Sequence, residues 1–579
     1  MKILLNYTLF SLLFFGLFVS CDVDLTPETT ISDDNFWNTT ADLRLAANYF
    51  YTTLPGLTAN EVAEDTWSTD AYPGLNGNTI SDGSRVAPTT DTVYNYYRIY
   101  QANNLIANAP LVLANGANEQ QVNWYVGEAR FFRAMYYFEK LRAYGGVPLI
   151  TRPLEVNDPE IYAGRASRDE VLQLIYEDLD FAIQSLRTPD QLVSSGEYGR
   201  ISNTAAMAFK SRVALFEGTR AKYHGYGDYS RHLTLAKEAA EAVISSGAHS
   251  LFSQERTGVQ GERLNDAYFN LFQQAGEGRS NRENIIVRVY GVNRENSISS
   301  TPVQRYLEGN TVLPTQNFVE SYLMADGLPI TQSPLYQEPD ATTTHASYFN
   351  KKDPRMAFTI FKRGDEFITS GNYTIPNPST QGTGFGLRKY ANKEFWNIQA
   401  SFIDRPVLRY AEVLLNYAEA IFELNGSITD IELNRSINLL RARLPQVNIG
   451  TTTNPNFANM PALTNTFVNE NGLDMLTEIR RERHVELAFE GFRYWDLIRW
   501  KTAEIELPKT ILGSYFFNEY TSSPTLRWSA STNVNERNYI ILQPSTLRRF
   551  DPRKDYLWPL PTDEIAKNPT VLEQNPGWD

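Results

Sequence analysis

Hydrophobic residues recur at helical spacing in two long parts of the chain. This spacing predicts helices over residues 34–54, 92–114, 122–144, 167–186, 202–219 and 233–246, and again over 408–424, 429–444 and 474–489. The helices that begin near residues 127, 168, 203 and 233 start 41, 35 and 30 residues apart. These intervals scatter around the tetratricopeptide period of about 34 residues. The pattern therefore indicates a degenerate array of helical hairpins.

Two sequence signals mark where helices start. Ser167 precedes Glu170, and Thr429 precedes Glu432, at the spacing of a capping box. In this motif the two side chains satisfy free main-chain N–H groups of the first turn. We therefore expect helices to begin directly after Ser167 and directly after Thr429.

The stretch between the two helical parts has a different pattern. From residue 251 to 404, Gly, Asn, Ser, Thr and Pro are frequent and long apolar stripes are absent. Short strands are predicted at 285–290, 358–361 and 388–390. Because a loop of this length is rarely structureless in a compact domain, we expect an elaborated region that carries recognition.

The predicted fold class is mainly α, with a helical-hairpin scaffold, a large loop-rich region and a few short strands. Residues 34–250 form the N-terminal helical region, and residues 251–404 form the loop-rich, ligand-facing region. Residues 405–579 form a C-terminal helical region with a Pro-rich tail. We expect the helices before and after the loop-rich region to pack together as one globular unit.

The N-terminus has the features of an export signal. Residues 1–20 combine a positive start, an apolar run over 9–19 that is short for a membrane span, and a small residue before Cys21. The motif ending at Cys21 resembles a bacterial lipobox, in which the thiol receives a diacylglycerol before cleavage. The alternative is an ordinary secretory signal with an incidental cysteine. We expect lipid attachment at Cys21, a tether over 21–33 and no later membrane span.

Composition narrows the classes of function. The net charge of −14 argues against a general nucleic-acid binder, and a single cysteine excludes an internal disulfide or a thiolate zinc cluster. The five histidines lack metal-ligand spacing, and no phosphate loop, dinucleotide fingerprint or nucleophile elbow is present. We predict no catalytic residue, metal or cofactor, although loop carboxylates leave an irregular structural calcium site open.

The segment from 479 to 500 concentrates charge on a helix. Its charged residues fall on or beside the apolar face and alternate in sign, and they are Arg483, Glu486, Glu490, Arg493, Asp496 and Arg499. One interpretation is an active site. We favour a buried ion-pair lattice that locks helices together, because charges on an apolar face need partners when they are buried.

Several motifs occur in order over most of the mature chain. They are the lipobox at Cys21, RFFRAMYYF at 130–138 with GGVP at 145–148, GRISNTAA at 199–206, DPR at 353–355, RYAEVLLNYAE at 409–419, the block 482–500, LWPLP at 557–561, and the closing NP at 568–569 and QNPG at 574–577. In this combination the chain resembles the SusD/RagB family of Bacteroidota outer-membrane lipoproteins.

The resemblance implies a specific role. Members of that family are mostly helical, with four tetratricopeptide-like hairpins and a looped region, and the lipidated cysteine tethers them at the cell surface on the outer membrane. They cap a SusC-like TonB-dependent barrel and capture glycans, or in some members peptides, without catalysis. Two other classes remain open: a lipid-anchored glycoside hydrolase, and a repeat-type protein adaptor with no sugar site.

A glycan site needs aromatic rings beside carboxylates, amides or Arg, because sugars offer C–H faces and hydroxyls. We hypothesise one shallow site that joins residues of an N-terminal loop with residues of the loop-rich region, namely Asp65, Trp67, Asp70, Tyr72, Arg388, Tyr390 and Trp396. The alternative is that Trp67 and Trp396 only pack their loops onto the scaffold.

Overall fold

A computed structural model describes residues 36–73, 77–291, 300–309, 311–369, 371–374, 382–522, 533–569 and 572–578. The proposed signal peptide, Cys21 and the tether over 21–33 lie outside these residues. In the part that is described, the protein is mainly helical and its strands are short.

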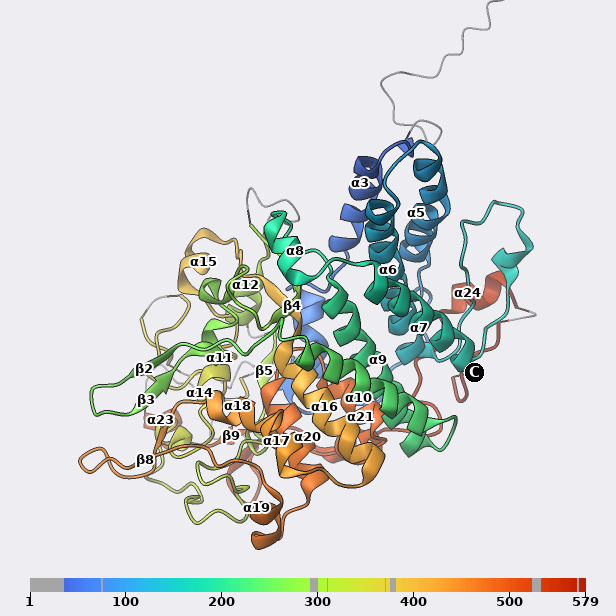
Figure 1. The fold of residues 1–579 in the computed structure, drawn as a ribbon. Coiled ribbons are helices and arrows are strands. Elements are labelled where there is room, and N and C mark those ends of the chain that lie inside the picture. The colour runs from blue at the N-terminus through green and yellow to red at the C-terminus, as the bar shows by residue number, and fades with distance from the viewer. Residues whose placement is uncertain are drawn as a thin grey trace, which may run out of the picture.

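Long helices pack side by side in chain order to form the scaffold (Figure 1). They are α3 (Thr40–Tyr51), α5 (Tyr97–Ala114), α6 (Glu119–Tyr144), α7 (Arg168–Ser185), α9 (Asn203–His224) and α10 (Tyr229–Ser245), with the short α8 (Pro189–Ser194) between α7 and α9. Helix α5 packs on α6, α6 on α7, α7 on α9, and α9 on α10. Helices α6 and α9, which are buried on nearly all sides, are therefore covered by their neighbours in the array.

The chain returns to this array after the loop-rich region. Helix α16 packs on α9 and α10, and α20 packs on α16. The helices of this part are α16 (Tyr410–Asn425), α17 (Asp430–Asn434), α18 (Ile437–Arg443), α19 (Asn465–Glu470), α20 (Met475–Glu486), α21 (Arg493–Arg499), α22 (Ala503–Glu506) and α24 (Thr562–Lys567). Apolar side chains from both helical parts form one core, because neither part can bury its stripe alone.

Both predicted capping boxes are present. Ser167 and Glu170 close the start of α7, and Thr429 and Glu432 close the start of α17. The continuous helix predicted over 429–444 is wrong, because the chain leaves helical geometry at Ser436, where φ is −138° and ψ is −100°. The Ser436 hydroxyl donates to the carbonyl of Glu432 at 2.6 Å, so a local side-chain bond competes with the helix there.

The loop-rich region lies to the left of the array in Figure 1 and has its own core. Its elements are β2 (Glu255–Thr257), β3 (Arg263–Asn265), α11 (Ala267–Asn270), η3 (Gln274–Gly276), β4 (Asn284–Arg288), α12 (Val303–Glu308), β5 (Leu313–Pro314), α13 (Gln316–Val319), η4 (Ser347–Phe349), α14 (Arg355–Thr359) and α15 (Lys393–Ile398). This second core also takes side chains from Phe517, Tyr520 and Ile540, so part of the predicted C-terminal region packs here.

The strands that the structure describes pair as short antiparallel ribbons. β4 pairs with β6 (Arg405–Arg409), which leads directly into α16 and so ties the loop-rich region to the scaffold. The other pairs are β1 (Ala71–Tyr72) with β5, β2 with β3, β7 (Val447–Asn448) with β8 (Phe457–Ala458), and β9 (Ile511–Tyr515) with β10 (Tyr539–Gln543). The remaining short helices are α4 (Ala59–Val62), η1 (Ala63–Trp67), η2 (Pro159–Tyr162), α23 (Glu519–Ser522) and η6 (Ser545–Leu547).

Two of the three predicted strands in this region are reduced to an isolated antiparallel bridge between Ile360 and Leu387, flanked by a hydrogen bond from the Arg388 N–H to the Thr359 carbonyl. The segment predicted over 358–361 begins inside α14, which starts after Pro354, where the Asp353 carboxylate accepts from the Arg355 N–H at 2.9 Å. The segment predicted over 388–390 ends in a turn, in which Tyr390 has a φ of +66°. Local capping and turn bonds thus keep either segment from forming a longer strand.

Candidate functional site

A cavity of about 630 Å³ lies between the helical array and the N-terminal loops. Its walls come from η1, α5, α6, α9, β6 and α21, and from the loop that precedes α5. The lining residues considered below are Glu64, Trp67, Arg85, Arg98, Arg142, Arg212, Arg405, Arg483, Trp495, Arg499 and Trp558. Segments far apart in the sequence therefore build a single polar and aromatic chamber.

Local hydrogen bonds hold η1 against this chamber. The hydroxyls of Thr66 and Ser68 each donate to the main-chain carbonyl three residues earlier, at 2.6 and 3.0 Å. These side-chain bonds stabilise η1, which is a tight helical turn of only a few residues. They fix Glu64 and Trp67 at the cavity wall.

Aromatic rings form one side of the cavity. The ring of Trp67 meets the edges of Trp558 at 5.3 Å, Tyr494 at 5.7 Å and Trp495 at 6.4 Å between ring centroids. Trp495 and Trp558 stack at 5.5 Å. Trp67 is half-buried while Trp495 and Trp558 are buried, so Trp67 is the ring of this cluster most available to a ligand.

Two charged side chains at the cavity have unused hydrogen-bonding capacity. Glu64 and Arg142 each make no hydrogen bond and no ion pair with another residue that the structure describes. The Arg142 guanidinium stacks over Trp495, 4.4 Å from the ring centroid. Burial raises the pKa of Glu64, although Arg142 and Arg405 act in the opposite direction. This pair offers donors and an acceptor to a ligand.

The predicted residues on either side of Trp67 lie deeper than expected. The Asp65 carboxyl is buried, and burial together with the nearby Asp70 raises its pKa to about 8. Asp70 is also buried and lies 2.6 Å from Nε2 of His484, which comes from α20. Tyr72 is half-buried in β1 and pairs with Leu313 of β5. These residues connect η1 to the scaffold and to the loop-rich region.

Of the seven predicted residues, Trp67 lines the cavity, whereas Asp65, Asp70, Tyr72, Arg388, Tyr390 and Trp396 do not. The Arg388 guanidinium donates to the carbonyl of Ala357 at 2.7 Å, and the Trp396 indole donates to the carboxylate of Glu308 at 2.8 Å. Tyr390 is buried, with 3% of its surface exposed. In this conformation Arg388 and Trp396 contact other parts of the loop-rich region.

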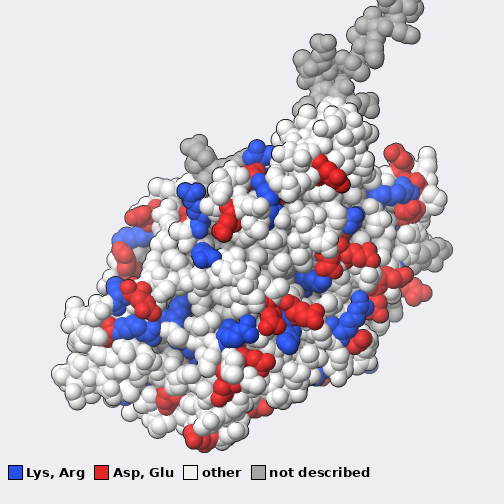
Figure 2. All heavy atoms as spheres, viewed as in Figure 1, with Lys and Arg blue, Asp and Glu red and all other residues white. Residues whose placement is uncertain are grey.

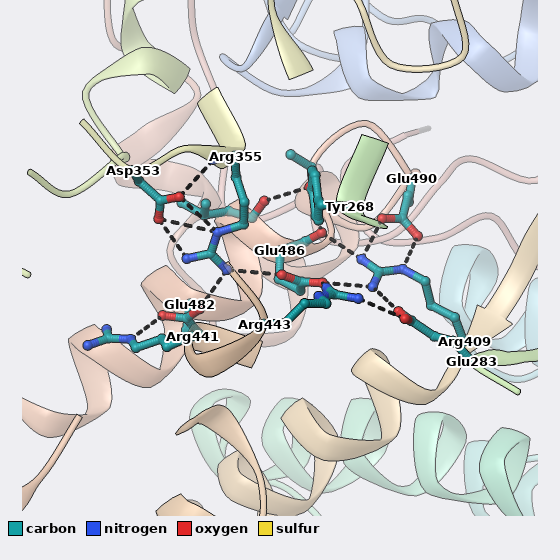
Figure 3. Close-up of polar contacts among 12 residues, drawn as sticks. Tyr268, Glu283, Asp353, Arg355, Arg409, Arg441, Arg443, Glu482, Glu486 and Glu490 are labelled. Carbon is teal, nitrogen blue, oxygen red and sulfur yellow. Dashed lines mark hydrogen bonds and ion pairs between the residues drawn. The ribbon is translucent and has the colours of Figure 1, made fainter. Parts of the chain in front are cut away.

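The charged segment of α20 and the turn after it forms ion pairs in the interior (Figure 3). The carboxylate of Glu486 accepts from Arg355 at 3.0 Å, from Arg409 at 2.8 Å and from Arg443 at 2.5 Å. Arg409 also donates two hydrogen bonds to Glu490, at 2.9 and 2.8 Å. All five side chains are at most 5% exposed. The lattice thereby joins α14, β6, α18 and α20.

The remaining residues predicted for this lattice also lie in ion pairs. Asp496 lies between Arg483 at 2.9 Å and Arg499 at 2.8 Å. Arg493 approaches Asp70 at 3.8 Å. These contacts link α20 to α21, and Arg483, Asp496 and Arg499 also line the cavity.

Sequence reasoning missed part of the cavity wall. Trp495 and Trp558 lay inside the motifs 482–500 and 557–561, and their position within such motifs was the available signal. Arg142 occupies an ordinary position near the end of a regular helix, and no local pattern distinguishes it from a solvated charge. Only the fold shows that it faces a chamber.

The same motifs are recognised when the chain is compared with known proteins. Residues 272–578 match the model of the SusD family. The chain belongs to the SusD family. Residues 56–215 match a second SusD-like family, described as starch-binding and associating with the outer membrane.

Relatives within the SusD family cover nearly the whole chain. A SusD-like protein of Formosa agariphila is 27% identical over 517 residues, which cover 86% of this chain and 91% of that protein. The structure resembles a SusD-like carbohydrate-binding protein from Bacteroides fragilis, with a TM-score of 0.72 and 23% identity over 93% of this chain and 100% of that one. It also resembles a laminarin-binding SusD-like protein, with a TM-score of 0.56 and 20% identity over the same shares.

Within the described ranges, no helix is long and apolar enough to cross a bilayer. Within the same ranges, no group of three or more His, Cys, Asp or Glu residues is arranged to hold a metal ion.

Proposed function

We propose that this SusD-family protein binds glycans at the cell surface and delivers them to a SusC-like TonB-dependent barrel in the outer membrane. Membership of the family supports this proposal, and so do the similar structures described as carbohydrate-binding and laminarin-binding. We propose that the chain is anchored by lipid on Cys21. The diacylglycerol on the thiol would supply two acyl chains, and stable membrane attachment needs more than one. We further propose that it binds its ligand without catalysis.

The observation that supports binding best is the chemistry of the cavity. Trp67 supplies an aromatic surface, while Glu64 and Arg142 supply an acceptor and donors that no described residue uses. A sugar ring has an apolar face for the indole and hydroxyl groups for both charged side chains. Buried polar groups without partners cost free energy, and a ligand that satisfies them recovers that cost.

The test is calorimetry of the mature lipoprotein in detergent against a panel that includes laminarin and xyloglucan oligosaccharides. We expect Trp67→Ala to weaken binding of the preferred glycan at least about tenfold, which corresponds to about 1.4 kcal/mol. Trp67→Phe keeps a ring against Trp558 and controls for loss of packing. Trp396→Ala is the matched control, because Trp396 lies away from the cavity.

The outcomes separate the candidate sites and functions. Loss of binding with Trp396→Ala alone would place the site on the loop-rich region near α15. Binding of peptides in place of glycans would favour the peptide-binding members of the family. Release of reducing sugar during incubation would contradict the binding-only proposal and favour a lipid-anchored hydrolase.

A further inference from the structure

Arg142 lies near the end of α6 with its charge directed into the cavity. It is half-buried, and its guanidinium carbon lies over the ring of Trp495, 4.4 Å from the ring centroid. A cation–π contact of this kind attracts the charge and uses none of the N–H donors in a hydrogen bond to an oxygen. No residue that the structure describes accepts a hydrogen bond from them or forms an ion pair with them.

The other arginines that line the cavity are matched by the protein itself. Arg405 donates to the carbonyl of Gly56. The rest lie within 4 Å of a carboxylate, in the pairs Arg85–Asp91, Arg98–Glu139, Arg212–Glu412, Arg483–Asp496 and Arg499–Glu419. Among the described residues that line the cavity, Arg142 is therefore the arginine that has no hydrogen-bond acceptor in the protein. Its acceptor has to come from outside the chain.

Burial lowers the pKa of Arg142, and Glu64 is the nearby carboxylate that opposes this effect most, although the two groups are not within ion-pair distance. The missing side chain at Gly491 leaves room for Glu64, since a Cβ there would lie 3.0 Å from Oε2 of Glu64. An ionised Glu64 opposes the binding of an anion at Arg142. Removing the charge of Glu64 should therefore strengthen anion binding, whereas removing the charge of Arg142 should weaken it.

We propose that the glycan this cavity accepts carries an acidic group, a carboxylate or a sulfate, and that Arg142 binds it. The inference rests on the proposed function and specifies the class of glycan. Two oxygens of a planar carboxylate or of a sulfate match the paired donors of a guanidinium, and charge-assisted bonds of this kind are about twice as strong as neutral ones. Partial burial strengthens the bond further, because the pair is less screened by water.

The test compares acidic probes with neutral probes of the same linkage. Oligogalacturonate is paired with its carboxyl-reduced form, and κ-carrageenan oligosaccharide is paired with its desulfated form. Calorimetry of the mature lipoprotein should show at least about tenfold tighter binding of one acidic probe than of its neutral partner, and the preferred pair identifies carboxylate or sulfate. The preference should weaken as salt is raised, since the contact is electrostatic.

Variants assign the effect to the residue. Arg142→Gln should abolish the acidic preference, because it weakens the binding of the acidic probe more than that of its neutral partner. Arg142→Lys should restore part of the preference, because the positive charge remains although the planar pair of donors is lost. Glu64→Gln should increase the affinity for the acidic probe. Melting temperatures of the variants control for folding.

Three results would overturn the inference. They are equal binding of each acidic probe and its neutral partner by the wild type, an acidic preference that survives Arg142→Gln, and weaker acidic binding with Glu64→Gln. If neutral glycans still bind in these cases, the proposed function stands. If neither the acidic nor the neutral probes, nor the wider glycan panel, bind at all, the proposed function fails as well.

Discussion

Arg409 connects two carboxylates of the same charged segment, because it donates two hydrogen bonds to Glu490 and one to Glu486 at 2.8 Å. The three side chains come from β6 and from the end of α20 with the turn that follows it. Each of these groups has lost its water, so each depends on the others to remain charged in the interior.

We expect Glu486→Gln to destabilise the protein by about 3–5 kcal/mol, since it removes a carboxylate that Arg355, Arg409 and Arg443 share and leaves the buried cluster with excess positive charge. Urea unfolding followed by circular dichroism measures the loss. The matched control is Arg537→Gln, because Arg537 pairs with Glu338 at the surface with 51% and 52% of the two side chains exposed. That change should cost no more than about 1 kcal/mol. Equal effects of the two variants would contradict a stabilising interior lattice.

Stability should fall in acid because of a neutral histidine in the second core. His345 accepts from the Arg363 N–H through Nδ1 and donates from Nε2 to the Gly384 carbonyl, so its ring is uncharged. Burial lowers the pKa of His345 to about 4, whereas the unfolded ring titrates near 6.5. Between these values the unfolded state binds more protons, and the free energy of unfolding therefore decreases as the pH falls.

Urea titrations at pH 7.5, 6.5, 5.5 and 4.5 measure this dependence. His345→Gln should remove up to about 3 kcal/mol of the acid-dependent loss by pH 4. A second loss of stability at lower pH comes from Glu486 in the lattice. Burial raises the pKa of this carboxyl, but Arg443, Arg409 and Arg355 lower it more, to about 2. The stabilisation by ionised Glu486 is fully present above about pH 4.5 and disappears as the pH falls towards 2. Constant stability from pH 7.5 to 4.5 would contradict the histidine assignment.

Close packing of α9 on α10 requires a glycine. A Cβ at Gly218 would lie 2.8 Å from Cγ and 2.9 Å from the main-chain nitrogen of Leu233. We expect Gly218→Ala to destabilise the protein by about 1–3 kcal/mol, because the main chain of α10 has to move. Gly127→Ala in α6 is the graded control, since its Cβ would meet only side chains, the nearest at 3.2 Å from Leu186. Differential scanning calorimetry should give the Gly218 variant a lower melting temperature than the Gly127 variant. The reverse order would argue against a tight α9–α10 contact.

Gly491 lines the cavity next to the carboxylate of Glu64. Its φ is +83°, and a Cβ there would lie 3.0 Å from Oε2 of Glu64. Gly491→Ala should therefore cost about 1–2 kcal/mol in stability and also change glycan affinity, since the carboxylate has to shift. Gly116→Ala is the control for backbone strain alone, because φ is +86° and its Cβ would meet nothing within 4 Å. If both variants lose stability and neither changes affinity, Glu64 does not contact the ligand.

Local patterns along the chain predicted much of the scaffold. The stripes over 122–144 and 408–424 and the capping box at Ser167 correspond to α6, α16 and the start of α7. These features depend on residues three and four positions apart, so a single sequence contains them. The strand predictions over 358–361 and 388–390 were too long, because a helix start and a turn interrupt the two segments.

The acidic net charge predicted that the protein is not a general nucleic-acid binder. Basic and acidic side chains are interspersed on the face drawn in Figure 2. The alternating charges over 483–499 could likewise be read as an interior lattice, because charge on an apolar face demands partners.

The sequence by itself determined the helical hairpins, the loop-rich insertion, the family and the need for partners among the charges of α20. Tertiary structure decided which charges found a partner. Arg142 and Arg483 look alike along the chain, yet Asp496 lies 2.9 Å from Arg483 while no described carboxylate lies within 4 Å of Arg142. The same holds for the tryptophans, since Trp67 faces the cavity and Trp396 bonds to Glu308. Whether a side chain is left free for a ligand depends on residues hundreds of positions away, and helical spacing contains no information about them.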